Sequence, residues 1–592
     1  MALPASTQAP HPAGTTTAPP GDRASGDPTP GDPTPGDPTP ATPGDPTPAT
    51  PGDPTPDPRT PATPATPGDP TPDPRTPAPR PSRRSPRPRT SRLPAPRLRG
   101  ALGFGAVLRP PGALLPWGWA AALFALYATV AVRRHLLMRT TGYDLGIFDQ
   151  AVRAYAELRA PVVPLRGEGF HLLGDHFHPL LAALAPLYRL WPSPLCLLTA
   201  QSALLAVAVV PLARWAARAL GPRSAHAVAA GYGLSWGIAS AAAFDFHEVA
   251  LAVPLIAFAL EALAHRRWRP AVAWAAPLLL VKEDLGLTLA AVGVYIALKG
   301  PRRLGAATAV AGVAGSLIEV RLLLPAFHPG GAYAHGDNLT EGHGSLLATL
   351  AHAPLDALRP DIKAMTLVLV FAPSALLALR SPLSLIAVPT LAWRMLSENS
   401  FHWGTAFHYS AVLMPVVSAG LIDALTVWRR HDHPLGARHV RASLATVLAV
   451  TLVMLPSFPL AQVAQRATWR TTGHIQAARA LLARIPDGAT VAASNRLVPQ
   501  LTSRCTVVVF PTFPVAGKLY EYDNKRLPRP TAEWIVHDRH PPEAWPYRTG
   551  HWPYPGRQQE AELAAAQRLH GYRKVAQRDG ITLLRLARPA RR

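Results

Sequence analysis

The stretch PWGWAAALFALYATVAVRRHLLMRTTGYDLGIFDQ, Pro116 to Gln150, contains the two features on which this sequence is organised. Its first half is an apolar run, Pro116–Val132, of the length that a bilayer core requires. Its last ten residues, TGYDLGIFDQ, place two carboxylates, Asp144 and Asp149, shortly after that run. The stretch therefore predicts a membrane span that leads into a polar site.

Further apolar runs of helix length lie between Leu115 and Pro459, in a chain of 592 residues that is 48% hydrophobic and 16% charged. A run of about 17–25 apolar residues is typical of a transmembrane helix. The strands of soluble α/β enzymes are also apolar, but they are short and bounded by turns. The pattern predicts an all-α polytopic membrane domain.

The formal net charge of +23 would also suit a nucleic-acid-binding protein. Many of the basic residues, however, flank the apolar runs, as expected from the positive-inside rule and from anionic lipid headgroups. These basic segments are 83–99, 214–223, 265–269, 299–303 and 429–441. We therefore expect the chain to contact membrane lipids and no nucleic acid. The two cysteines, Cys196 and Cys505, provide no disulfide framework.

Composition divides the chain into three regions. Residues 1–98 repeat GDPTP and ATP with almost no large apolar residue, which predicts a disordered, proline-rich tail. Residues 101–460 form the predicted transmembrane domain, and residues 470–588 have the sequence pattern of a small soluble α/β domain. The basic end of the tail predicts a cytoplasmic N-terminus in a multi-pass plasma-membrane protein.

About eleven crossings are predicted, which would place the C-terminal α/β domain outside the cytoplasm. They are Pro116–Val132, Pro194–Ala213, Ala225–Ala242, Val249–Ala264, Trp268–Val281, Leu285–Leu298, Leu304–Leu323, Ile362–Leu379, Pro382–Leu396, Tyr409–Val427 and Ala442–Phe458. In this topology most arginine clusters lie inside and the polar groups discussed below lie outside. Two spans are short for a crossing, those on either side of Lys282, and Arg133 and Arg134 depart from the positive-inside rule.

The C-terminal region predicts two helices and a sheet. HIQAARALLARI and EAELAAAQRLHG are amphipathic helix patterns, and ATVAAS, CTVVVF and AEWIVHD are buried strands. A hairpin is expected through Asp579-Gly580 into ITLLRLA. Two loops rich in Pro, Trp and Tyr, near 510–530 and 539–556, are expected either to cover the membrane site or to pack at the interface.

Asp144 and Asp149 are the candidate catalytic residues. A carboxylate at the exported end of a span can act as a general base or hold a cation. Alternatively, Thr141-x-x-Asp144 is a capping box that only starts a helix. Residues five apart on a helix point about 140° away from each other, so the two aspartates are not expected to form one dyad.

Three further groups combine carboxylates with imidazole or ammonium: 175–178 (DHFH), 245–248 (DFHE) and 282–284 (KED). Such sets suit a divalent metal or a proton relay that binds phosphate. Hydrogen-bonded loops, or a self-neutralising turn at 282–284, are the alternatives. Ionisable residues near membrane spans usually form pairs or serve function. His402 and His408 follow aromatic residues, where histidines are more often structural.

The segments YDLGIFDQ, HFHP (176–179), DFHE and KEDLGL resemble those of the domain of unknown function 2079 family of bacterial membrane proteins. That family is similar to the GT-C class of membrane glycosyltransferases, which use sugars linked to polyprenyl phosphate. The resemblance implies that an acidic residue of the first exported loop, Asp144 or Asp149, is the base; we expect Asp144 to be the base, with Asp149 supporting it or a cation. The expected substrate-binding residues are His176, His178, Asp245, His247, Glu248, Lys282, Glu283, Asp284 and His408.

We therefore expect a GT-C-like glycosyltransferase that moves a sugar from a polyprenyl-phosphate donor to an extracytoplasmic acceptor. No certain cofactor is expected, and a divalent metal remains open. One alternative is a transporter or flippase, which predicts ionisable groups near the mid-membrane and an internal repeat. The other is a non-catalytic envelope assembly protein, which would tolerate substitution of Asp144.

Overall fold

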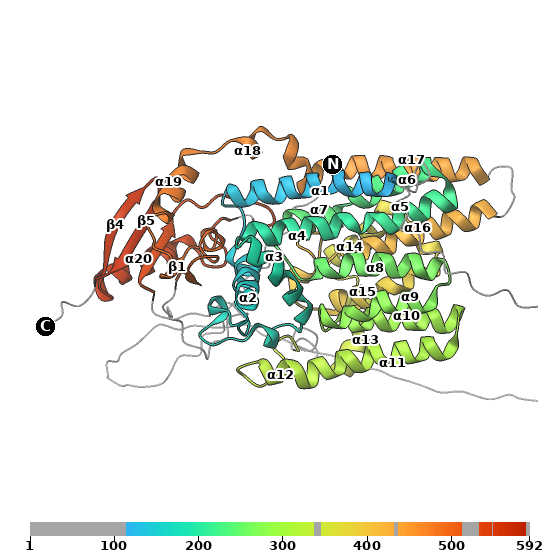
Figure 1. Cartoon of the computed structure of the whole chain (residues 1–592), viewed down its shortest axis with the longest axis horizontal. Helices are drawn as coiled ribbons and strands as arrows, with labels where there is room; N and C mark the ends of the chain where they lie inside the picture. Colours follow the sequence, from blue (N-terminus) through green and yellow to red (C-terminus); the bar gives the residue numbers. More distant parts are fainter. Residues whose placement is uncertain (1–113, 337–344, 431–435, 512–531, 548, 588–592) are drawn as a thin grey trace, which may run out of the picture. The chain divides into compact units, whose positions relative to one another are not determined.

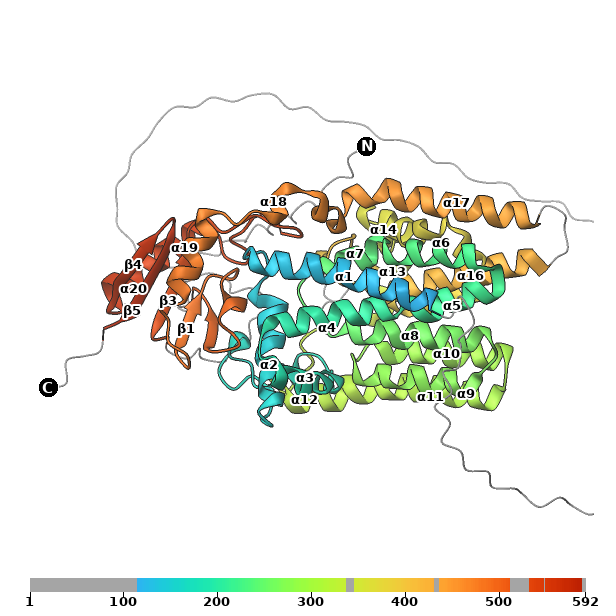
Figure 2. The same cartoon turned by 45° about the horizontal axis from the view of Figure 1, so that its top comes forward.

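The computed structural model describes residues 114–336, 345–430, 436–511, 532–547 and 549–587. The predicted tail, residues 1–98, and most of the predicted loop 510–530 lie outside these residues. The described chain is mainly helical and ends in a small sheet, as the sequence predicted. In Figures 1 and 2 the long helices run side by side, the sheet lies beyond one end of them, and α2 crosses that end.

The helices of the bundle coincide with the apolar runs. Their bounds are α1 Leu115–Leu136, α2 Ile147–Ala156, α3 Ala185–Leu190, α4 Pro194–Val207, α5 Val209–Leu220, α6 Pro222–Gly233, α7 Trp236–Ala243, α8 Val249–Ala264, α9 Trp268–Ala275, α10 Leu285–Lys299, α11 Arg302–Ile318, α12 Leu324–Phe327, α13 Leu346–Asp356, α14 Asp361–Phe371, α15 Val388–Leu396, α16 Leu413–Arg430 and α17 Gly436–Met454. Short 3₁₀ segments extend several of them, for example Ala276–Leu280 after α9 and Pro382–Ala387 before α15.

Four stretches of the described chain are long and apolar enough to cross a bilayer: Leu115–Leu136, Pro194–Leu220, Arg302–Phe327 and Gly436–Ser457. The other predicted spans are shorter or interrupted. The predicted span Ala225–Ala242, for instance, is divided between α6 and α7. Eleven crossings therefore stay a prediction.

Burial differs strongly among the four long stretches. Pro194–Leu220 has 67% of its most apolar window buried, whereas Arg302–Phe327 and Gly436–Ser457 each have 22% buried. Large apolar side chains such as Val310 and Val453 are exposed on these outer helices. An extensive exposed apolar surface of this kind suits contact with lipid chains.

Helices α10 and α11 pack closely because glycines line their contact. A Cβ atom added to Gly305 would overlap the Ala297 backbone, and one added to Gly312 would overlap the Gly286 carbonyl and the Ala290 backbone. Small residues allow membrane helices to approach closely enough for dispersion contacts along their backbones.

We expect Gly305→Leu or Gly312→Leu to lower the stability of the solubilised full-length protein by about 1–3 kcal/mol or more, because the added side chain overpacks a backbone contact. Thermal unfolding followed by size-exclusion chromatography measures the effect. Gly118→Leu in α1 is the matched control, since a Cβ atom there has no neighbour within 4 Å. Equal melting temperatures for all three variants would contradict this packing.

Charged residues mark both ends of α8. Glu261, near its C-terminal end, is buried and accepts a 2.8 Å hydrogen bond from Nε of Arg214 in α5, and Nη1 of Arg218 lies 3.4 Å from Glu261 Oε1. His247 and Glu248 directly precede the N-terminal end of α8. A helix of this length spans about 24 Å, so the two polar groups are well separated. The group at the N-terminal end lies on the side where the sheet is found.

The predicted C-terminal helices, strands and hairpin are confirmed, and a short helix, α18 Arg466–Trp469, precedes them. They are α19 Gly473–Leu482, β1 Thr490–Ala493, β2 Thr506–Val509, β3 Trp534–Asp538, α20 Gly556–Leu569, β4 Tyr572–Arg578 and β5 Ile581–Leu586. The sheet order is β2-β1-β3-β5-β4, with β1 parallel to β2 and β3 and with β5 antiparallel to β3 and β4. The hairpin between β4 and β5 turns at Asp579-Gly580, as predicted.

The sheet shares a hydrophobic core with the segment that follows α1. Leu145 and Phe148 belong to the same buried cluster as Val498 and Val507. Gln150 Nε2 also donates a 2.9 Å hydrogen bond to the Val507 carbonyl. The loop that contains Asp144 is therefore fixed from the sheet side as well as from the helices.

The contacts of His474 in α19 should make the stability of the folded protein depend on pH. Its Nε2 lies 3.1 Å from Asp538 Oδ2 and its Nδ1 lies 2.8 Å from the Asp579 carbonyl oxygen, and the Asp538 hydrogen bond raises the pKa of His474. The stabilisation that the charged His474 provides is complete below the pKa that histidine has in the unfolded chain, about 6.5. It is lost as the pH rises through the higher pKa that His474 has in the folded protein.

We expect His474→Gln to lower the melting temperature of the full-length protein at pH 6 and to have a smaller effect at pH 8.5. Thermal unfolding in detergent across this range checks the result. His439→Gln, at an exposed position of α17, serves as the control. The assignment is wrong if the His474 variant loses the same stability at both pH values.

Candidate functional site

Asp144 lies in an unusual turn between α1 and α2. The turn occupies Gly142–Gly146, and Asp144 has φ 73° and ψ −80°. A non-glycine residue in this region of backbone space is strained by about 1–3 kcal/mol and persists only when the surrounding structure holds it. The strained backbone of Asp144 therefore indicates that neighbouring elements hold this turn in place.

Two elements far away in sequence hold this turn. The Thr141 N–H donates a 2.8 Å hydrogen bond to Asp245 Oδ2, and the Thr141 hydroxyl also contacts that carboxylate. From the sheet side, Asn495 after β1 accepts from the Gly142 N–H twice, at its side-chain oxygen (2.8 Å) and at its carbonyl (2.9 Å). Thr141 makes no side-chain capping bond, so the predicted capping box is wrong. Asp144 does not serve as a helix cap.

The Asp144 carboxylate faces two histidines from other loops. His247 comes from the segment between α7 and α8, and His408 from the segment before α16. One oxygen of Asp144 and one ring nitrogen of each histidine all lie within 4.8 Å of one another. The two imidazole rings are stacked with centroids 3.3 Å apart, and both residues are buried. We call Asp144, His247 and His408 the histidine–aspartate cluster.

A buried ion pair supports the histidine–aspartate cluster. Lys282 Nζ lies 2.9 Å from Glu248 Oε1, and Glu248 Oε2 lies 2.8 Å from His247 Nδ1. The second contact has the distance of an ion pair but not the angles of a hydrogen bond. The KED group is thus not a self-neutralising turn, because its lysine pairs with the DFHE group.

The protonation of these groups follows from their burial and charge. Burial raises the pKa of Asp144 well above its ordinary value, and the nearby Asp245 and Glu248 carboxylates raise it further. Burial lowers the pKa of His247 to about 4, so its imidazole is neutral at pH 7. Burial also raises the pKa of Asp245, to about 6, against the opposing effect of its Thr141 hydrogen bonds. The cluster therefore favours binding of a proton or a cation.

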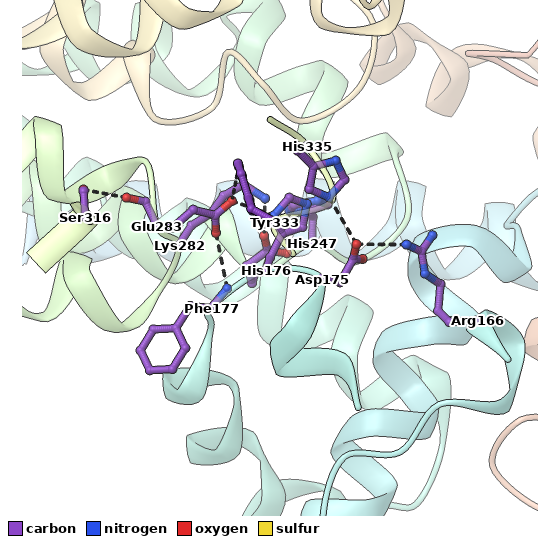
Figure 3. A network of polar contacts seen from close by, with 11 residues as sticks. Arg166, Asp175, His176, Phe177, His247, Lys282, Glu283, Ser316, Tyr333 and His335 are labelled. Carbon is purple, nitrogen blue, oxygen red and sulfur yellow. Dashed lines mark hydrogen bonds and ion pairs between the residues drawn. The ribbon is translucent and has the colours of Figure 1, made fainter. Parts of the chain in front are cut away.

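A second polar network lies beside this cluster and is drawn in Figure 3. Arg166 Nη2 donates to Asp175 Oδ1 at 2.9 Å, and His335 Nε2 lies 3.1 Å from the same oxygen. His176 Nδ1 lies 2.7 Å from Glu283 Oε1, and its ring stacks on that of His335 at 4.5 Å. This set consists of matched ion pairs, and we call it the arginine–histidine network.

The remaining predicted residues lie close to these two groups. His178 is buried and its ring meets Phe148 edge to face, with centroids 5.7 Å apart. Asp284 precedes α10, and its Oδ1 is buried and forms no hydrogen bond within the described part of the chain. The structure thus brings the predicted 175–178, 245–248 and 282–284 groups together at one end of the bundle.

Asp149, predicted to support Asp144 or a cation, lies outside the histidine–aspartate cluster. It is fully buried in α2 and accepts a 2.9 Å hydrogen bond from the Tyr188 hydroxyl of α3. Burial raises its pKa to about 7. No hydrogen bond or ion pair joins Asp149 to Asp144 within the described part of the chain, so its support of Asp144 stays a prediction.

The loop 539–556 lies over the Asp144 turn. The Tyr143 and Trp552 rings meet edge to face at 5.2 Å, and Tyr547 stacks on Trp552 at 4.3 Å. Asn495 Nδ2 donates a 3.0 Å hydrogen bond to the Trp552 carbonyl. Phe407, beside His408, meets Tyr547 at 5.7 Å. Of the two alternatives for this loop, covering the membrane site is the one that its contacts favour.

Sequence reasoning missed several residues that build the site. Asn495 and Arg496 follow β1, and Arg496 donates to the carbonyls of Arg139 (2.5 Å) and Ala544 (3.3 Å). Arg134 contacts the Trp545 carbonyl and donates to Gln462 at 3.2 Å. The departure of Arg133 and Arg134 from the positive-inside rule was the one signal, because these arginines bind the C-terminal region and not headgroups.

Comparisons with known proteins give two results and one negative finding. No curated protein matches the chain. Two crystal structures of ArnT from Cupriavidus metallidurans, one bound to undecaprenyl phosphate and one in the apo state, are similar at 16% identity, with TM-scores of 0.46 and 0.45. Each alignment covers 79% of this chain and 98% of the other. At these TM-scores we conclude nothing about function from the likeness.

The match to a sequence family is extensive. Residues 134–583 match the family described as "Predicted membrane protein (DUF2079)", and this range includes the histidine–aspartate cluster, the arginine–histidine network and all of the sheet except the last three residues of β5. The chain belongs to the predicted membrane protein family DUF2079.

Proposed function

We propose that this chain is a GT-C-like membrane glycosyltransferase that moves a sugar from a polyprenyl-phosphate-linked donor to an extracytoplasmic acceptor. The observation that carries the proposal is the convergence of Asp144, His247, His408 and the Lys282–Glu248 pair at one end of the helical bundle. Buried ionisable groups at such a position are costly, and they are most often kept for binding or catalysis.

Asp144 is the proposed base. In the transfer, the acceptor hydroxyl oxygen forms a bond to the anomeric carbon, the bond from that carbon to the phosphate oxygen breaks, and polyprenyl phosphate leaves as an anion. The acceptor proton passes to the Asp144 carboxylate. The elevated pKa of Asp144 suits this role, because a carboxylate that holds its proton tightly is a stronger base once ionised.

Lys282 and His176 are the proposed partners of the donor phosphate. Lys282 uses one of its three N–H donors on Glu248, so two donors remain for phosphate oxygens. The Glu283 carboxylate raises the pKa of His176 above its ordinary value, against burial and Lys282, which favours the charged imidazolium. His178, Asp245, His247, Glu248, Glu283, Asp284 and His408 complete the proposed substrate-binding set.

The proposed topology follows from this chemistry. Eleven crossings, a cytoplasmic N-terminus, a transmembrane domain over residues 101–460 and an extracytoplasmic α/β domain over residues 470–588 would place the site at the exported face. A lipid-linked donor can reach such a site from within the bilayer. No nucleotide-binding motif is present in the sequence, which agrees with a donor that carries no nucleotide.

The transporter alternative is less well supported. His247-Glu248 and 282–284 lie directly before the first residues of α8 and α10, and Asp144 lies in a turn between helices. Transporter sites generally lie near the bilayer midplane, where helices are interrupted. Grouping of the charged residues at helix ends favours a site that opens at a membrane face.

Deletion of the gene in its native host tests the proposed reaction class. We expect a polyprenyl-phosphate sugar to accumulate and one envelope glycan to lose the corresponding sugar, as measured by mass spectrometry of extracted lipids and released glycans. Loss of a transporter that delivers this donor would give the same profile, and sugar transfer by the purified protein separates the two alternatives. No change in either profile would contradict the transferase and favour an assembly role.

A further inference from the structure

The histidine–aspartate cluster has the composition of a metal-ligand set. Two imidazole nitrogens and one carboxylate oxygen lie within 4.8 Å of one another and come from three separate loops. A bound ion would require them to approach to about 2.0–2.2 Å from a common centre. In the described structure the three atoms are already grouped in one place, within 4.8 Å of one another.

One imidazole nitrogen in this cluster has no polar partner. His247 and His408 are each only 5% exposed, and Nδ1 of His408 is buried and forms no hydrogen bond within the described part of the chain. An unpartnered buried polar atom costs about 1–3 kcal/mol, and such atoms in native structures generally indicate a water, an ion or a ligand. The two imidazole rings are stacked with centroids 3.3 Å apart, which places both histidines beside Asp144.

The surroundings of His247 match those of metal-bound histidines. Such histidines usually direct their second ring nitrogen at a carboxylate, which fixes the ring and strengthens the ligand. Here Glu248 Oε2 lies 2.8 Å from His247 Nδ1, and Lys282 binds the other Glu248 oxygen at 2.9 Å. This leaves Nε2 of His247 as the atom free to bind an ion.

The charge of the site also favours a cation. Asp144 forms no ion pair within the described ranges, although Glu248 is neutralised by Lys282. A divalent ion at the cluster would balance the Asp144 carboxylate and satisfy imidazole nitrogens at the same time. Neither a lysine nor an arginine of the described chain forms a salt bridge with Asp144 that would provide the same balance.

We propose that Asp144, His247 and His408 bind a divalent transition-metal ion of the zinc type. Imidazole ligands select such ions over Mg²⁺ and Ca²⁺, which prefer oxygen ligands alone. Three protein ligands leave at least one coordination position open, as in catalytic zinc sites. The site does not depend on the proposed glycosyl transfer. If that function also holds, one Asp144 oxygen binds the ion and the other remains available to the acceptor proton.

The arginine–histidine network provides an internal contrast. Asp175, His176 and His335 also lie within 4.8 Å of one another. Their polar atoms, however, already have protein partners: Arg166 pairs with Asp175 at 2.9 Å and Glu283 with His176 at 2.7 Å (Figure 3). Binding an ion there would displace these pairs, so the first cluster is the assigned site.

The test measures metal in the purified full-length protein by inductively coupled plasma mass spectrometry, after incubation with Zn²⁺, Mn²⁺, Co²⁺ or Mg²⁺ and gel filtration. We expect one transition-metal ion per chain in the wild type and in the control His439→Ala. His247→Ala and His408→Ala should each lower the affinity for the ion more than about 100-fold. Replacing a residue that only hydrogen-bonds to a metal ligand typically lowers the affinity about 10–100-fold. Bound Co²⁺ should show visible absorption bands that both variants lose.

Three outcomes would overturn the assignment. A wild-type protein that retains no metal would mean that a water molecule or a substrate group satisfies the imidazoles. Metal that His176→Ala removes, but His247→Ala and His408→Ala retain, would belong to the second network. Mg²⁺ bound in preference to Zn²⁺ would indicate a site made of oxygens. A fold check by gel-filtration profile accompanies each variant, and His247→Gln and His408→Gln replace alanine if either variant aggregates.

Discussion

A protein with Asp144→Asn is expected to transfer sugar about 10²–10⁴ times more slowly than the wild type, because the acceptor hydroxyl loses its base. The asparagine side chain has nearly the same shape, and the Asp144 turn is held by the backbone bonds of Thr141 and Gly142, so the fold should survive. A deletion strain complemented with this variant should keep the lipid and glycan profile of the deletion.

The matched control is Asp487→Asn, at an exposed carboxylate in the turn before β1 that pairs with Arg504 at 2.8 Å. Complementation with this variant should restore the wild-type profile at equal protein abundance, as measured by immunoblot. Restoration by Asp144→Asn as well would show that the carboxylate is not needed, and the catalytic assignment would fail.

Replacing Lys282 by methionine is expected to cost about 3–5 kcal/mol of stability, because the Glu248 carboxylate would remain buried without its ion pair. Glu248 is fully buried, and its Oε1 lies 2.9 Å from Lys282 Nζ. His247 and the Lys282 ammonium together hold the pKa of Glu248 well below its ordinary value, against the effect of burial. The cost should therefore shrink as the pH falls into the range in which carboxylates take up protons.

A double variant, Lys282→Met with Glu248→Gln, separates the interaction energy of the ion pair from the separate effects of the two residues. It should recover much of the stability that Lys282→Met loses, because no uncompensated charge remains. Lys299→Met, at the exposed far end of α10, is the control. Thermal unfolding of the full-length protein measures all variants. A Lys282→Met protein as stable as the control would contradict the buried pair.

Sequence patterns predicted the elements of this protein better than their contacts. The apolar runs gave the helices, and alternating or buried runs gave β1, β2, β3 and the β4–β5 hairpin, because these features depend on local periodicity. The grouping of 175–178, 245–248 and 282–284 at one end followed from counting spans, since residues at corresponding span ends share a membrane face.

The finer geometry of the site was not accessible from sequence. The contact of Asn495 with Gly142, 353 positions apart, depends on how the sheet sits on the end of the bundle. The capping-box prediction at Thr141 failed for the same reason, because Asp245 competes for the Thr141 hydroxyl and N–H. The aromatic residue before His408 favoured a structural role for this histidine, yet its ring stacks directly on that of His247. In each case a long-range contact overrode a local pattern.

The central claim, that Asp144 performs glycosyl transfer from a lipid phosphate, is tested most directly with the purified protein. The polyprenyl-phosphate sugar that accumulates in the deletion strain is incubated with the full-length protein and the acceptor glycan from the same strain. We predict release of free polyprenyl phosphate together with a glycan heavier by one sugar, with the wild type and Asp487→Asn but not with Asp144→Asn. Equal release by wild type and Asp144→Asn, or no release by the wild type, would contradict the account.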